Sequence, residues 1–222
     1  MEAIFYILDT MKNKPLSLAF LAVFGLSSAQ YEDPKSMATF GLMSSFLNQR
    51  WTFGYNHKVS DRIRIGTDLG YGAKGIVVPP IENDENYKSF EIRPAFYYSL
   101  APDSVLKHFV GADFFFIRTD RTLTNSHFYD DYQYYWADKF DLERKKTGAN
   151  LTYSILLHKE SSRIAFMPKI GFGLRNLDIK YKNLQNLSES EPPKDGLPPF
   201  TDPPREGTKF NFDLDIKLVY KF

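Results

Sequence analysis

Four histidines are the residues with the clearest catalytic potential: His57, His108, His127 and His158. A serine hydrolase needs a base within hydrogen-bonding reach of the hydroxyl group and a third group that orients the base. Only His127 has a serine beside it, Ser126, with Asp130 and Asp131 shortly after. Neighbours along one loop are weak evidence for a triad, and the other three histidines lie beside short turns. We therefore expect no enzymatic activity and assign no catalytic residue.

Four aspartates in the same region could offer oxygen ligands to Ca²⁺: Asp130, Asp131, Asp138 and Asp141. Their spacing matches no calcium loop, so we expect a solvated acidic segment and no metal. Nothing in the sequence indicates a cofactor. The chain has no cysteine, which excludes disulfides and a lipid anchor on a cysteine.

Aromatic side chains lie between these acids, at Tyr132, Tyr134, Tyr135 and Trp136. Tyrosine and tryptophan are common at binding hot spots, so these residues could contact an unidentified extracellular ligand. The alternative is that they form part of an aromatic belt at a membrane interface. Both interpretations stay open.

The elements that would position these residues are β-strands in which apolar and polar residues alternate strictly. In Phe210–Phe222 every second residue is apolar and the others are polar or charged, and the chain ends on an aromatic residue. The alternation recurs in five earlier segments: Ile63–Tyr71, Phe90–Leu100, Val110–Phe116, Thr147–Leu157 and Ile164–Leu174. No apolar face of these segments carries a charge. This pattern predicts strands with lipid on one side and a polar lumen on the other.

Two further strands precede them, a weaker one around Phe40–Phe46 and a good one over Trp51–Asn56, which makes about eight. Short linkers alternate with long ones, and the long ones are Gly72–Lys88, Thr119–Lys145 and Asn176–Gly207. Outer-membrane barrels have short periplasmic turns and long outer loops. An even strand number then places both chain ends in the periplasm. Pro94 and Pro168 fall inside strands, where we expect bulges.

The N-terminus predicts a secretory signal over residues 1–29. We expect Met11 to be the true start, because a basic segment followed by an apolar one begins there. Residues 30–36 would form a short periplasmic segment and 37–222 the barrel domain. The net charge of +1 and the lack of a basic stripe give no reason to expect nucleic acid as a partner.

The segments resemble the outer membrane protein β-barrel domain family, the small eight-stranded barrels of Gram-negative bacteria. The resemblance rests on Val59–Tyr71, Ile92–Tyr98, Phe166–Phe172 and Leu218–Phe222, and covers residues 37–222 as a pattern. It implies a porin-like, all-β, antiparallel up-and-down transmembrane barrel in the cell outer membrane, surrounded by outer-membrane lipid. It also implies that Leu218, Tyr220 and Phe222 form a signal for the barrel-assembly machinery.

An eight-stranded barrel is only wide enough for side chains to fill it, and buried charges must pair. We therefore expect a plugged lumen in a monomer whose role is structural or in surface interaction through its outer loops. Transport of a small solute or ion, a lipid A-modifying enzyme and a soluble carrier are the alternatives. The expected lumen charges are Arg62, Arg64, Asp68, Glu91, Arg93, Asp113, Lys169, Arg175, Asp213, Asp215 and Lys217.

Overall fold

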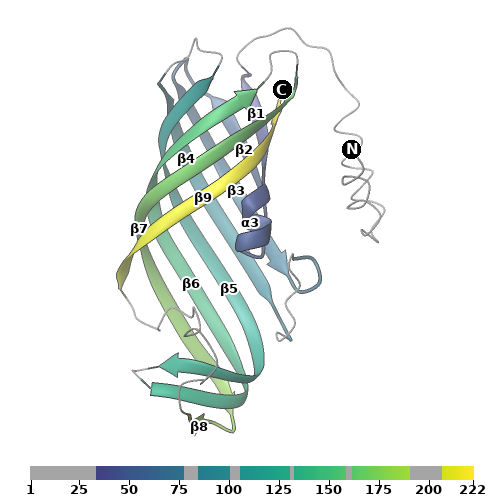
Figure 1. Cartoon of the computed structure of the whole chain (residues 1–222), viewed down its shortest axis with the longest axis vertical. Coiled ribbons are helices and arrows are strands. Elements are labelled where there is room, and N and C mark those ends of the chain that lie inside the picture. Colours follow the sequence, from purple (N-terminus) through teal and green to yellow (C-terminus); the bar gives the residue numbers. More distant parts are fainter. Residues whose placement is uncertain (1–33, 78–84, 101–105, 131–132, 159–161, 191–206) are drawn as a thin grey trace.

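The computed structural model describes residues 34–77, 85–100, 106–130, 133–158, 162–190 and 207–222. Eight antiparallel strands form a closed ring in the order β5-β4-β3-β2-β1-β9-β7-β6, which the β5–β6 pairing completes (Figure 1). The ring strands are β1 Ser36–Gly41, β2 Trp51–Lys58, β3 Ile63–Ala73, β4 Lys88–Ser99, β5 Lys107–Asp130, β6 Gln133–His158, β7 Ile164–Gln185 and β9 Thr208–Lys221. The two-residue β8, Ser188–Glu189, adds to the end of β6. The predicted eight-stranded antiparallel barrel is confirmed.

The two ends of the described barrel chain meet on one side of the ring. β1 pairs with β9 over five residue pairs, from Met37 with Lys221 to Gly41 with Lys217. The backbone amide of Phe222 donates to the carbonyl of Ser36 at 3.0 Å. Both strand termini therefore lie at the same end of the barrel, as the even strand number predicts.

Side chains alternate between the two faces of the wall because the strands have a period of two. The outward face is apolar and exposed: Phe114 is 62% and Leu151 75% exposed. The inward face is polar and closed, with Lys169 at 3% and Asp113 at 1%. This distribution is the reverse of the one in soluble proteins.

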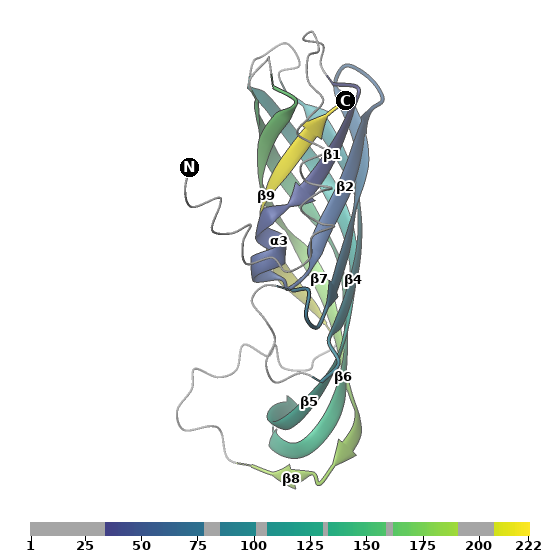
Figure 2. The same ribbon diagram turned by 90° about the vertical axis from the view of Figure 1, so that its right-hand side faces the viewer.

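The first predicted strand is wrong in its second half. Residues Leu42–Leu47 form a short helix, α3, between β1 and β2 in the barrel wall (Figures 1 and 2). Ser44 and Ser45 are buried, whereas Phe46 and Leu47 are 59% and 62% exposed. Apolar residues at positions 42, 43, 46 and 47 fit the period of a helix. The interpretation of this segment as an alternating strand overlooked that spacing.

Two of the predicted long loops are also wrong in large part. Most of Thr119–Lys145 continues as β5 and β6, and β7 continues to Gln185, so three strands project far beyond the rest of the ring (Figure 1). The bulges expected at Pro94 and Pro168 do not occur either, because the pairing register is the same on both sides of each proline. The shift in register lies between Lys139 and Asp141 of β6, opposite Asn183, whose φ of 54° is left-handed.

Several sequence-based predictions concern parts of the chain outside the described residues. These are the signal over residues 1–29, most of the 30–36 segment, and the positions of Asp131 and Tyr132. They stay predictions.

An apolar cluster fills the barrel at the end where the chain termini meet. It consists of Met37, Tyr97, Phe109, Leu156, Ala165, Met167 and Val219. Each of these residues is at most 4% exposed. We call it the apolar seal. Its members interrupt the polar inward face of six strands, so one end of the lumen is closed by packed side chains.

Replacement of Leu156 in the apolar seal by alanine is expected to lower the free energy of unfolding by about 2–5 kcal/mol, because it leaves a cavity in a packed interior. Leu156 is 0% exposed, whereas its neighbour Leu157 points outward. Leu157→Ala leaves no internal cavity and should cost much less. Urea unfolding of both variants in the same detergent checks this. Equal losses would contradict the assignment of the two faces.

Candidate functional site

The inward charges of the barrel form one connected network, which is the candidate site. Arg93 on β4 is its centre. Its Nε donates to Oε1 of Glu91 at 2.7 Å, and its Nη1 lies 3.0 Å from Oδ2 of Asp213 and 3.3 Å from Oδ1 of Asp113. Glu91 also binds Arg50, which lies directly before β2. Three strands, β4, β5 and β9, therefore meet through one guanidinium group.

Lys169 on β7 holds the second side of the same carboxylates. Its Nζ lies 2.8 Å from Oδ2 of Asp213 and 3.0 Å from Oδ2 of Asp113. The amide of Asn150 donates to Asp113 at 2.8 Å and accepts from Asn211 at the same distance. The oxygens of Asp113 are thus shared among three donors, which is how a buried carboxylate is stabilised.

A second buried ion pair lies closer to the apolar seal. Lys217 on β9 pairs with Asp68 on β3, and the hydroxyl of Thr39 donates to the other oxygen of Asp68 at 3.3 Å. Asp215 is buried nearby, where Oδ1 accepts from the backbone amide of Ile216. The ion-paired part of the lumen therefore contains four cations, Arg50, Arg93, Lys169 and Lys217, and four carboxylates, Asp68, Glu91, Asp113 and Asp213.

Most of the lumen charges expected from the sequence are in this network, but three lie elsewhere. Arg62 is exposed at the turn before β3 and donates to the hydroxyl of Tyr98 at 3.0 Å, so its assignment to the lumen is wrong. Arg64 is buried at the seal end and donates to the carbonyl of Pro34 at 2.6 Å. Arg175 lies at the opposite end, paired in register with Gly148 and Lys209.

The sequence reasoning missed Arg50, Asn150 and Asn211 as parts of the network. Arg50 is two residues before Thr52 and so shares its face of the strand. Extension of the alternating pattern of β2 by one residue would have placed Arg50 in the lumen. The two asparagines were visible on polar faces, but an uncharged side chain gave no signal that it would connect the charges.

The interior is closely packed beside the apolar seal. Beside the apolar seal, the space between Met37, Asn56, Arg64, Tyr97, Phe109 and Met167 has no room for a water molecule. Glycines in the wall leave room for neighbouring side chains in the lumen. A Cβ on Gly54, for example, would lie 1.9 Å from Oδ1 of Asp68. The lumen is a packed polar core closed by an apolar one.

Beyond the apolar band, the outward face of β5, β6 and β7 becomes charged. The outward row Phe116–Thr147–Asn176 is followed by Arg118–Lys145–Asp178 and then by Asp120–Glu143–Lys180. Glu143 accepts from Lys182 at 2.6 Å and from Lys145 at 3.0 Å, and these contacts lower its pKa to about 2. The abrupt change from apolar to charged rows marks one edge of the apolar band.

The far end of the projecting strands has its own small core on the inward face. Phe128, Ala137 and Phe140 are buried, with Leu123, Tyr135, Leu142 and Tyr181 packed against them. Of the expected interaction residues, Tyr135 stacks on Phe128 at 5.5 Å between ring centroids, while Tyr134 and Trp136 are partly exposed. Tyr135 thus supports the projecting strands.

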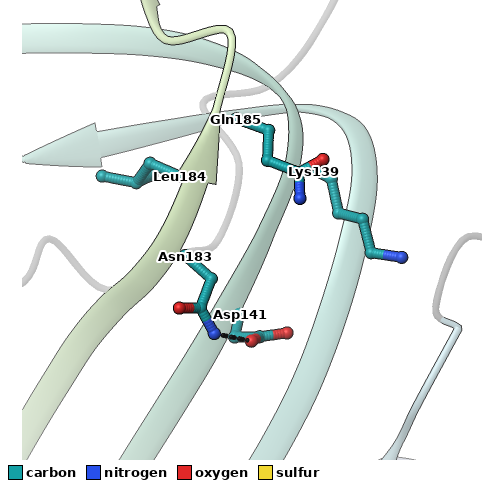
Figure 3. Close-up of a pocket in the computed structure, with 5 residues that line it drawn as sticks. All are labelled: Lys139, Asp141, Asn183, Leu184 and Gln185. Atoms are coloured by element: carbon teal, nitrogen blue, oxygen red, sulfur yellow. Dashed lines mark hydrogen bonds between the residues drawn. The ribbon is translucent and has the colours of Figure 1, made fainter.

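A hollow of about 420 Å³ lies on this projection where the β6–β7 register shifts (Figure 3). It is lined by Lys139, Asp141, Asn183, Leu184 and Gln185. Its charged groups already have partners. Asp141 accepts from Asn183 and Thr122, both at 2.6 Å, and Lys139 pairs with Glu85. The hollow is a consequence of the bulge, and its polar groups are occupied.

The catalytic and metal candidates are not assembled in the described part of the chain. The hydroxyl of Ser126 donates to the carbonyl of Thr124, and His127 instead meets the hydroxyl of Ser190 at 3.1 Å. His57, His108 and His158 are at the seal end of the strands. The described residues contain no group of three or more acids, histidines or cysteines that could hold a metal ion. No helix among them is long and apolar enough to cross a membrane.

Two solved structures are similar to this chain. Acinetobacter baumannii CarO has 10% sequence identity and a TM-score of 0.44, over 85% of this chain and 98% of that one. Acinetobacter baumannii CarO2 has 11% identity and a TM-score of 0.42, with the same coverage. No family model and no curated protein matches the chain, so the family suggested by the sequence pattern stays a prediction.

Replacement of Lys169 by methionine is expected to cost about 3–5 kcal/mol in the free energy of unfolding, because it leaves two buried carboxylates without their shared cation. The double variant Lys169→Met/Asp213→Asn should recover part of this loss. Lys180→Met, which removes an exposed pair with Asp178 at 3.5 Å, should cost under about 1 kcal/mol. Urea unfolding of the three variants measures the differences, and a neutral Lys169→Met would contradict the network.

Proposed function

We propose that this protein is an outer-membrane β-barrel whose plugged interior serves as a rigid support for a projection on the cell surface. The observation that carries the proposal is the inverted distribution of its side chains. Large apolar residues are exposed around the ring, among them Phe53, Leu69, Phe96, Phe172 and Phe212. Soluble monomers rarely expose an apolar area of this extent, because it would cause aggregation in water.

A bilayer explains both faces of the wall. Closure of the ring satisfies the backbone groups of the strands without water, which is a requirement inside hydrocarbon. The apolar band then contacts acyl chains, and the charged rows that begin at Arg118 and Lys145 lie outside the hydrocarbon. The ends of β1 and β9 would face the periplasm, and the β5–β7 projection the outside.

The packed interior favours a structural or surface-interaction role over transport. Ion pairs fill the middle of the lumen, and the apolar seal closes its periplasmic end. The projection offers the partly exposed Tyr134 and Trp136 to an extracellular ligand. Monomeric assembly, and recognition of Leu218, Tyr220 and Phe222 by the assembly machinery, belong to the same proposal. Phe222 is 68% exposed and packs edge-on against Tyr220 at 5.1 Å.

Spin labels on single introduced cysteines test the membrane location, since the chain has no cysteine of its own. Labels at Phe96 and Ile170 should be relaxed by oxygen and protected from an aqueous nickel reagent, because these positions would face acyl chains. A label at Lys145, on the same outward face beyond the apolar band, should show the opposite preference. Aqueous access at Phe96 and Ile170 in the reconstituted protein would rule out the membrane location.

Purified protein in a planar bilayer is expected to give no steady single-channel current, because no water path crosses the apolar seal. Folding is verified independently by the gel shift on boiling that folded barrels show, and insertion by co-flotation of the protein with liposomes of the same lipid. A stable current from protein proven to be folded would instead favour the transport of a small solute or ion.

A further inference from the structure

The extracellular mouth of the lumen contains a cation that the ion-pair network does not use. Lys146 on β6 lies one row beyond the apolar band, in register with Ile117 and Leu177, and it shares the inward face of Gly148 and Asn150. Its Nζ lies 5.7 Å from the centre of the buried Phe115 ring. Within the described residues, Nζ has no carboxylate within salt-bridge distance.

Other cations surround Lys146 on the inward side. Arg144 is two residues away on the same face of β6, and Arg175 comes from β7, with Lys209 of β9 paired to it in register. Arg93 lies 5.1 Å from the centre of the same Phe115 ring, and Glu91 is held by both Arg93 and Arg50. We call Lys146, Arg144, Arg175 and Lys209 the mouth cluster.

The electrostatics of Lys146 reflect this crowding. Burial lowers its pKa to about 8, and the positive charges of Arg175, Arg144, Arg50 and Arg93 contribute in the same direction. Exposed like charges usually separate into solvent, but these side chains come from paired strands with a fixed register. An anion at the mouth would reduce the repulsion and would favour the charged form of Lys146.

We propose that the mouth cluster binds an oxyanion, either a free inorganic or organic anion or the anionic group of a lipid. The balanced network below supports this assignment, because its four carboxylates already serve four cations and none is available to Lys146. The proposal goes beyond a structural role, since it gives the extracellular mouth a ligand of defined charge. It depends on the barrel fold and is independent of any ligand of Tyr134 and Trp136.

The test is calorimetric titration of the folded protein with sulfate, in a non-ionic detergent at low ionic strength. Sulfate keeps its charge over the whole pH range used. Lys146→Met should weaken binding by about tenfold or more. Lys145→Met is the matched control, because Lys145 is the next residue, points outward and pairs with Glu143. It should change the affinity by less than about twofold.

The pH dependence provides a second readout. Lys146 is charged below about pH 8, so sulfate affinity in the wild type should be highest there and fall as the pH rises toward 9. The arginines around it stay charged in this range. Lys146→Met should lose the part of the pH dependence between 7 and 9, while Lys145→Met should retain it.

Nanodiscs distinguish the source of the anion. Sulfate binding in detergent that depends on Lys146 supports a free oxyanion. Enrichment of phosphatidylglycerol over phosphatidylcholine around the protein, lost in Lys146→Met and kept in Lys145→Met, supports a lipid headgroup. If neither ligand binds, or if both variants weaken binding equally while the boiling-dependent gel shift shows an intact barrel, the mouth site is wrong and the barrel proposal still stands.

Discussion

The structure depends on one constraint, which is that every charge inside a narrow closed ring must find its partner inside the same ring. A ring of eight strands has an interior that side chains alone can fill. Asp113 and Lys169 are buried there, so their contacts with each other and with Asp213 replace hydration. Because their partners come from β4, β5, β7 and β9, the same contacts that neutralise the charges also hold distant strands in register. An error in register of one residue would turn these charges toward the apolar exterior.

The two ends of the lumen answer this constraint in different ways. At the seal end, an apolar cluster takes the place of ion pairs, and the space beside it has no room for a water molecule. At the mouth, Arg93 and Lys146 both contact the ring of Phe115, and Arg144 and Arg175 lie on the same inward face. A cation near an aromatic face is stabilised less than one in an ion pair. The two ends of the described interior therefore differ in chemistry, since one is packed with apolar side chains and the other carries cations.

The sequence predicted the faces of the strands well and the pairing of their residues poorly. Alternation assigned Asp68, Glu91 and Lys217 to the lumen, because the face of a side chain depends only on its position within its own strand. The same alternation can show where a strand continues, yet the charged outward face of residues 118–145 concealed the continuation of β5 and β6. That face is charged because it lies beyond the apolar band, so the rule that identifies a membrane strand cannot identify its extension. The partner of each charge depends on the stagger between strands, which no single segment contains.

The ring strands differ in length, so the wall of the barrel is low on one side and tall on the other. β1 ends at Gly41 and α3 takes the place of further strand, so the wall between β2 and β9 is low, whereas β5, β6 and β7 on the other side extend far outward (Figure 2). The inward face of this tall wall carries Lys146 and Arg144 and, farther out, the core around Phe140. A hairpin that only connected strands would gain nothing from a core of its own. A core that makes the extension rigid fixes the inward cations of β6 and β7 over the mouth, and this is the geometry that a surface site on a closed barrel requires.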